Sequence, residues 1–263
     1  MNLLMPGMYV SAQTVVHRID PRVKLGAALL LMVLPFVAPG WPGALLLVAA
    51  VGVVAALAAV PLGALVRTIR TVFWLGFFMF FFYAFTTPGT ALWTWGALSV
   101  TLPGLIAGGT QIYRLCLLVV ISSLLSYTTS PTQLAHGLEA LLAPLARLGL
   151  PVHDLAMVLT IALRFVPTIA QQVDKLSKAQ RARGLDYGYA PWNRARSWVP
   201  MFVPLFVAAF RRAERLAIAM EARGFRGAAQ RTHLRQLRLT RCDLVAALIV
   251  LSLTAAVLAT KLL

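Results

Sequence analysis

The sequence predicts an all-α, polytopic membrane protein with about five transmembrane helices, and its composition is the first reason. Hydrophobic residues make up 60% of the 263 residues and charged residues only 12%, and the mean hydropathy is +0.80. An average soluble domain carries about 25% charged residues. This balance excludes an ordinary soluble domain and a disordered chain. The two cysteines, which stand far apart, exclude a disulfide framework.

Five apolar runs are the candidates for the transmembrane helices. A helix needs about 20 apolar residues to cross the hydrocarbon core of a bilayer, and the first of the five runs is short for this purpose. Proline and glycine separate the runs, as expected at breaks between helices. The predicted spans cover residues 24–38, 43–66, 72–87, 104–126 and 244–262.

Lysine and arginine alternate between the gaps and thereby predict the orientation. Arg18, Arg22 and Lys24 precede the first span, Arg67 and Arg70 follow the second, and a long basic region follows the fourth. The gaps after the first and third spans carry no lysine or arginine. Because positive residues collect on the cytoplasmic side, we expect the N-terminus inside and the C-terminus outside.

The sequence therefore divides into three predicted parts. Residues 1–127 form an N-terminal cytoplasmic segment and four transmembrane helices, residues 128–242 form a cytoplasmic module, and residues 243–263 form the last transmembrane helix. Between Arg164 and Arg241 the module holds sixteen Lys and Arg against four acids, which is +12 of the net charge of +16. A basic cytoplasmic surface is attracted to anionic lipid. No motif that binds nucleic acid accompanies these charges.

Two polar or small-residue features lie inside the fourth span. Gly104 and Gly108 are spaced as in closely packed membrane helices. Arg114 lies well inside the span, where a charged side chain is costly. Because no acid lies in any predicted span, we expect Arg114 to bond carbonyls or polar side chains of another helix as a structural strut.

The cytoplasmic module is predicted to contain one short helix, 132–148, and two long helices, 154–183 and 198–223. Each long helix is apolar in its first half and polar in its second half. Each also ends in Ala-Arg-Gly, at Ala182, Arg183 and Gly184 in one helix and at Ala222, Arg223 and Gly224 in the other.

The Ala-Arg-Gly triplet has both a structural and a functional interpretation. Glycine just past a helix end takes a left-handed conformation and stops the helix, so one copy is an ordinary helix cap. Arginine, however, offers a planar fork of donors that suits carboxylates and carbonyls, and alanine lets another backbone come close. Two copies at the ends of two similar helices favour a pair of docking tips.

These features resemble the transmembrane coupling subunit, of EcfT type, of energy-coupling factor transporters, which are ABC-type importers of vitamins and metal ions in prokaryotic cell membranes. The resemblance covers nearly the whole chain. The residues that carry it are His17-Arg18-Ile19-Asp20-Pro21-Arg22, Lys24-Leu25, Arg164-Phe165-Val166-Pro167, Phe210-Arg211-Arg212-Ala213-Glu214, both Ala-Arg-Gly triplets, and the residues around the second triplet, Ala219-Met220-Glu221 and Phe225-Arg226-Gly227.

The resemblance implies partners and a mechanism. The two long helices would cross, and their Ala-Arg-Gly tips would dock into two cytoplasmic ATPase subunits, identical or different. A small membrane protein, the S component, would bind the substrate. ATP and Mg would be bound by the ATPase subunits, so that this chain would hold no cofactor or metal and would not be an enzyme.

The apolar first halves of the long helices form the expected surface for the S component or the membrane interface. An exposed apolar patch usually marks an interface, and packing of the two helices on each other is an equal alternative. The residues chosen for this surface are Met157, Ile161, Phe165, Phe202 and Phe206.

A secondary transporter or channel subunit with a basic cytoplasmic domain is the main alternative function. Such transporters usually place acids within the membrane, whereas all eight acids here lie outside or at the edges of the predicted spans. A membrane enzyme is disfavoured as well, because the four histidines are scattered and no paired carboxylates occur. The chain also lacks the GxxxxGK[ST] motif of ATP hydrolysis.

Overall fold

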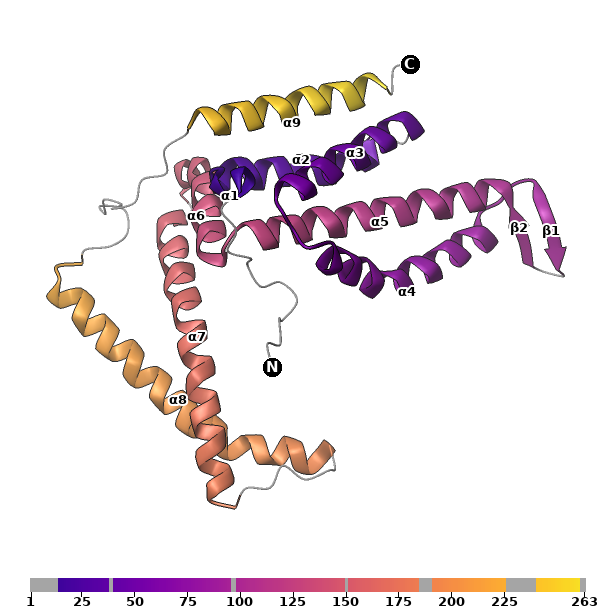
Figure 1. Ribbon diagram of the computed structural model, residues 1–263. Helices are drawn as coiled ribbons and strands as arrows, with labels where there is room; N and C mark the ends of the chain where they lie inside the picture. The colour runs from indigo at the N-terminus through magenta and orange to yellow at the C-terminus, as the bar shows by residue number, and fades with distance from the viewer. Residues whose placement is uncertain are drawn as a thin grey trace. The chain divides into compact units, whose positions relative to one another are not determined.

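The computed structural model describes residues 14–37, 40–95, 98–149, 151–184, 191–225 and 240–260. This part of the chain is helical apart from one short antiparallel hairpin (Figure 1), which confirms the predicted all-α class. The chain divides into two compact units. Unit 1 comprises Met1–Leu138 and Leu237–Leu263, and unit 2 comprises Glu139–Gln236.

Unit 1 contains the helices that match the five predicted spans, together with the hairpin. Its elements are α1 (Val15–Arg18), α2 (Pro21–Val37), α3 (Trp41–Leu57), α4 (Leu62–Thr86), β1 (Ala91–Trp95), β2 (Leu98–Thr101), α5 (Leu102–Thr128), the first part of α6 (Pro131–Leu142), and α9 (Arg241–Ala259).

Unit 1 is built around a small apolar core. The strongly buried members of this core come from α2, α3, the start of α4, α5 and α9, and they include Leu34, Leu47, Ile121 and Val257. Most other large apolar side chains on these helices are exposed. An apolar outer surface of this kind suits a bilayer, whose tails are themselves apolar.

Length and composition identify four helices that could cross a membrane: α4, α5, α7 (Val152–Ala182) and α9, with α3 as a shorter apolar helix of 17 residues. A helix of that length spans about 25 Å. α7 qualifies through its apolar first half, although the basic surroundings of its second half led us to place it in the cytoplasmic module. Its location outside the membrane remains a prediction.

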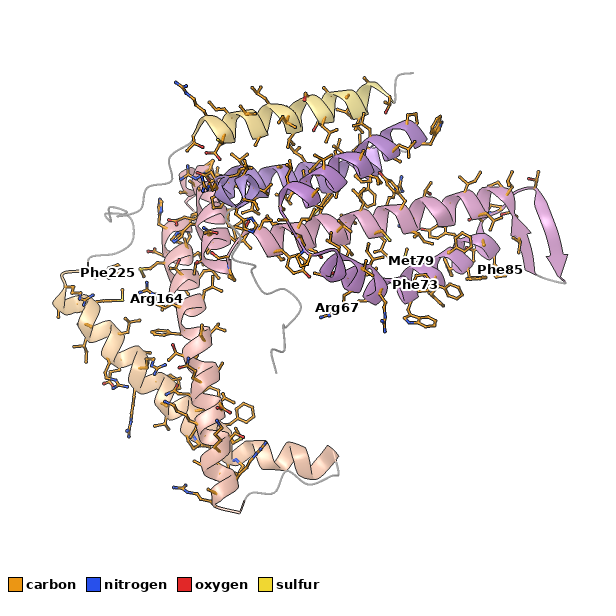
Figure 2. All side chains as sticks on the ribbon, viewed as in Figure 1. Arg67, Phe73, Met79, Phe85, Arg164 and Phe225 are labelled. Atoms are coloured by element: carbon orange, nitrogen blue, oxygen red, sulfur yellow. The ribbon has the colours of Figure 1, made fainter. Side chains whose placement is uncertain are left out.

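The predicted boundary between the second and third spans was wrong. Residues 43–66 are not one helix, because α3 ends at Leu57 and α4 begins at Leu62. Pro61 explains the break, since proline has no N–H to donate and disfavours helical geometry in the residue before it. Arg67 and Arg70 consequently lie in the first half of α4 rather than in a loop, and both are exposed. Figure 2 shows Arg67 near the start of that helix.

α4 and α5 pack antiparallel with their backbones in close approach. A Cβ atom on Gly104 would lie 2.7 Å from the main-chain oxygen of Tyr83, and one on Gly108 would lie 3.0 Å from that of Phe80. Neither position has room for a side chain. The close packing predicted from the spacing of these two glycines is thus confirmed.

We expect Gly108→Ala to destabilise the chain by about 1–3 kcal/mol, the usual cost of overpacking. Gly109 is the matched control, because a Cβ atom there meets nothing within 4 Å. Gly109→Ala should be neutral, or stabilising by up to about 1 kcal/mol through helix propensity. Thermal unfolding of the two detergent-purified variants makes the comparison, and equal midpoints would contradict the close approach.

Arg114 forms the expected strut. Its Nε donates a hydrogen bond to the main-chain oxygen of Pro35 at 3.0 Å, and its guanidinium lies 5.1 Å from the ring centroid of Phe36. Both partners are in the last turn of α2, where carbonyl groups lack partners within the helix and favour a positive charge. Arg114 therefore ties the end of α2 to the middle of α5.

Unit 2 contains the two long helices. After α6 come a 3-10 helix, η1 (Ala143–Leu148), then α7 and α8 (Pro191–Ala222). α7 and α8 pack against each other and cross (Figure 1), as predicted. The expected short helix 132–148 changes to the tighter 3-10 form at Ala143, next to Pro144. α8 is bent in Figure 1 and contains Pro200 and Pro204, residues that kink helices.

Candidate functional site

Both long helices end in a left-handed glycine, as the triplets predicted. The φ angle is +85° at Gly184 and +74° at Gly224, values that L-residues with a Cβ atom rarely adopt. The N–H of Gly184 donates to the oxygen of Arg181 at 3.0 Å, and that of Gly224 donates to the oxygen of Glu221 at 2.9 Å. The two tips therefore share the same turn.

At α8 a second hydrogen bond completes the cap. The N–H of Phe225 donates to the oxygen of Met220 at 3.1 Å. Together with the bond from Gly224 this makes a Schellman motif, which satisfies the last carbonyls of the helix. Phe225 lies directly beyond the tip in Figure 2. The corresponding residue after Gly184 lies outside the described residues.

The side chains at the two tips project into open space. Ala182, Arg183, Ala222 and Arg223 are all exposed, and a Cβ atom placed on either capping glycine meets nothing within 4 Å. Among the described residues, no hydrogen bond or ion pair holds the guanidinium of Arg183 or Arg223. Each tip thus presents an available fork of donors on a rigid helix end. Contact of the six triplet residues with ATPase subunits remains a prediction.

An aromatic stripe runs along the exposed face of α8. Phe202, Phe206 and Phe210 follow one another at helical spacing, with 6.5 Å between consecutive ring centroids. Their side chains are 49%, 58% and 71% exposed. We call these three residues the phenylalanine stripe. Its first two members are among the residues chosen from sequence for an apolar docking surface.

The opposite face of α8 packs in the interior of unit 2. Met201 is 4% exposed, and the guanidinium of Arg212 lies 5.8 Å from the ring centroid of Phe165 on α7. A cation over an aromatic face is attracted by the ring electrons. This pair therefore joins α8 to α7, so that Phe165 contributes to the packing of the two helices.

The structure places the three α7 residues chosen from sequence on a half-buried face. Met157, Ile161 and Phe165 are all of intermediate exposure. The exposed apolar residues of α7 lie on another face, which sequence reasoning missed: Leu155 at 61%, Val158 at 59%, Leu159 at 38%, Val166 at 59% and Ile169 at 37% exposure. Their helical spacing was visible in the sequence, but an apolar helix half offers two such stripes and does not reveal which one faces α8.

The described residues contain no group of three or more His, Cys, Asp or Glu side chains arranged to hold a metal ion. Two polar side-chain contacts of the described part of unit 2 link residues within α7 or between α6 and α7. Lys178 and Asp174 lie 2.7 Å apart on the surface of α7, and His153 Nδ1 lies 3.2 Å from Glu139 Oε1. The prominent features of unit 2 are thus its two arginine tips and its exposed apolar faces.

Comparison with known proteins gives consistent results. Residues 12–234 match the family CbiQ, described as cobalt transport protein. The chain is 40% identical to the energy-coupling factor transporter transmembrane protein EcfT of Acidaminococcus fermentans, over 94% of this chain and 92% of that protein. It is 42% identical to the protein of that name from Thermosediminibacter oceani, over 91% of each. With the Bacillus subtilis protein it shares 40% identity, over 96% of this chain and 97% of that protein. The chain therefore belongs to the CbiQ family and is an EcfT-type transmembrane component of an energy-coupling factor transporter.

Proposed function

We propose that this chain couples ATP hydrolysis by two ABC-type ATPase subunits to movement of a small S component that carries a vitamin or a metal ion. One observation carries the proposal. α7 and α8 pack together in one unit, and each ends in an exposed Ala-Arg-Gly tip with the same left-handed cap. Two similar tips suit the two similar ATPase domains of an ABC motor.

Each residue of a tip has a distinct role in this proposal. Alanine at 182 and 222 lets the backbone of an ATPase subunit approach. Arg183 and Arg223 supply forks of donors for carboxylates or carbonyls of that subunit. Gly184 and Gly224 end the helices in a turn that keeps each arginine at the tip. The chain itself performs no catalysis, and ATP and Mg bind to the ATPase subunits.

The exposed apolar faces supply the surface for the S component. The phenylalanine stripe on α8 is the centre of this surface, because exposed aromatic side chains are frequent anchors at interfaces. Met157, Ile161 and Phe165 support the stripe from α7. The pair formed by Arg212 and Phe165 links both faces, so that movement of the arginine tips reaches the apolar halves of the helices.

We place the N-terminus and the module 128–242 in the cytoplasm and the C-terminus outside. The structure of unit 1 supports a common side for the N-terminus and the end of the module, because α2 and α9 begin close together, where the main-chain N–H of Asp20 donates to Asp243. The positive residues of these segments favour the cytoplasmic side. Cysteine labelling at Gly40, Pro88 and Gln230 of the intact cell tests it. We expect Gly40 and Pro88 to be labelled from outside and Gln230 only after permeabilisation. Labelling of Gln230 from outside would contradict the orientation.

Copurification from the native membrane tests the function itself. We expect the tagged chain to bring down one or two kinds of ABC ATPase subunit and a small hydrophobic protein. The purified assembly in liposomes should take up substrate only with ATP on the tip side. Recovery of the chain without ATPase subunits, with uptake driven by an ion gradient, would instead support a secondary transporter.

A further inference from the structure

A buried polar cluster joins segments of unit 1 that lie far apart in the sequence. The side chains of Asp20, Lys24 and Asp243 are only 6%, 8% and 1% exposed. Charged side chains are almost never buried so completely unless they are paired. None of these three residues belongs to the proposed docking tips or to the apolar surface. Their burial therefore has to be explained by another role.

Asp243 is shared by the first turns of two helices. Its Oδ2 accepts hydrogen bonds from the main-chain N–H and the hydroxyl of Thr240, both at 2.7 Å, in the capping box that begins α9. Its Oδ1 accepts the N–H of Asp20 at 2.7 Å, at the start of α2. Helix N-termini carry unpaired N–H groups and favour negative charge. One carboxylate therefore holds the beginnings of α2 and α9 together.

Lys24 extends the cluster to the end of α5. Its Nζ donates to the main-chain oxygen of Thr128 at 3.1 Å and to that of His17 at 3.2 Å. A cation is favourable at the C-terminal turn of a helix, where carbonyl groups lack partners. Lys24 thus fixes the last turn of α5 against the first turns of α2.

The same part of α2 also holds α6. A Cβ atom on Gly137 would lie 3.0 Å from Cδ1 of Leu25 and 3.1 Å from Cβ of Pro21. α6 therefore lies directly on the first turns of α2, and a side chain at residue 137 would fit only if its neighbours shifted. Thr128, at the end of α5, and Gly137, in α6, are both in the stretch of chain that leads out of unit 1.

The chain passes between the two units at Leu138–Glu139 and again at Gln236–Leu237. The first passage follows Thr128 and α6, and the second precedes Thr240 and α9. We propose that Asp20, Lys24 and Asp243 form a clasp that holds the end of α5 and the start of α9 together on unit 1, near the points where the chain leaves and re-enters that unit, so that a displacement transmitted from unit 2 moves α2, α5 and α9 together. This inference rests on the proposed coupling function, and it makes Asp243 a positioning residue.

The test is the amount of substrate taken up per ATP hydrolysed by the purified transporter in liposomes. Asp243→Asn keeps the shape of the side chain but turns one acceptor oxygen into an amide donor that faces N–H groups. Coupling between two sites typically changes the binding affinity at one of them by about 5–150-fold. From the lower end of this range we expect the amount of substrate taken up per ATP to fall at least about fivefold in Asp243→Asn and in Lys24→Gln. ATP hydrolysis by each assembled complex should continue.

The matched controls are Asp174→Asn and Lys178→Gln. These two side chains form an ion pair of 2.7 Å on the surface of α7, where they are 63% and 74% exposed. Exposed pairs contribute little, and we expect uptake per ATP to stay unchanged in both variants. A charge is thereby removed from each type of residue without touching the clasp.

An unchanged amount of substrate taken up per ATP in Asp243→Asn would overturn the proposal. The proposal would also fail if this variant gave less assembled complex, but the complex that did assemble took up the normal amount of substrate per ATP. Should that variant fail to accumulate, Thr240→Val keeps the Asp243 carboxylate and its bond to Asp20, and removes the hydrogen bonds of the Thr240 hydroxyl in the capping box. It is measured in the same way. Amide hydrogen exchange of the purified chain tests the clasp independently of transport. We expect exchange at Asp20 and Thr240 to rise about tenfold or more in Asp243→Asn as local opening becomes easier. Absence of ATPase subunits from the unchanged chain would contradict only the proposed function.

Discussion

The double variant Arg183→Ala and Arg223→Ala is expected to abolish substrate uptake and to loosen the ATPase subunits. Truncating an arginine that anchors an interface commonly costs about 2 kcal/mol or more of binding free energy. Truncating one partner of a charge pair that loses water on binding costs more. Each guanidinium lies at the end of a long helix. Loss of one tip should therefore weaken the coupling of ATP hydrolysis to uptake, and loss of both should abolish it. Uptake and the quantity of ATPase retained during purification measure the two effects.

Two further variants separate docking from helix capping. Lysine at either site should restore little, because an ammonium group cannot reproduce the two-pronged geometry of the guanidinium. Arg215→Ala is the matched control, since Arg215 is exposed on α8 and its Nε donates to the main-chain oxygen of Arg211 in its own helix. We expect this control to transport normally. Full uptake by the double alanine variant would reduce the two triplets to ordinary helix ends.

The helix ends and the close helix contact could be predicted because their signals are local. Glycine after a run of helical residues can take a φ angle that other residues avoid. Gly184 and Gly224 therefore predict the two helix ends from the sequence alone. The spacing of Gly104 and Gly108 likewise announces a close approach of α5 to another helix. In both cases the glycine itself meets the requirement, either a left-handed φ angle or the absence of a side chain.

The break between α3 and α4 and the clasp depended on information that the sequence presents less directly. The apolar run 43–66 continues across Pro61, so that hydropathy outweighed the backbone effect of a single proline. Asp20 and Asp243 are 223 residues apart, and no pattern in the chain pairs them. Only the folded chain brings the start of α9 to the start of α2, where the Asp20 N–H reaches the Asp243 carboxylate. The choice of Met157, Ile161 and Phe165 on α7 met the same difficulty. Periodicity shows that a helix face is apolar, but it does not show which other element covers that face.

Phe202→Glu combined with Phe206→Glu is expected to release the S component while the ATPase subunits stay bound. Both side chains are about half exposed on α8, and full burial of a phenylalanine against a partner contributes about 1.5–3 kcal/mol. A carboxylate in the same place would also have to lose its water without a counter-charge. The arginine tips lie at the far, polar end of the helices and should keep their own partners.

The matched control for this pair is Ile218→Glu, because Ile218 is 59% exposed in the polar half of the same helix. It introduces a charge of the same kind on α8 away from the phenylalanine stripe and should retain both partners. Copurification of each variant with its ATPase subunits and S component gives the answer. Loss of all partners together would show that the stripe holds α7 and α8 to each other, since only a collapsed module would remove the tips as well. Selective loss of the S component would identify the phenylalanine stripe as the surface through which α7 and α8 act on the S component.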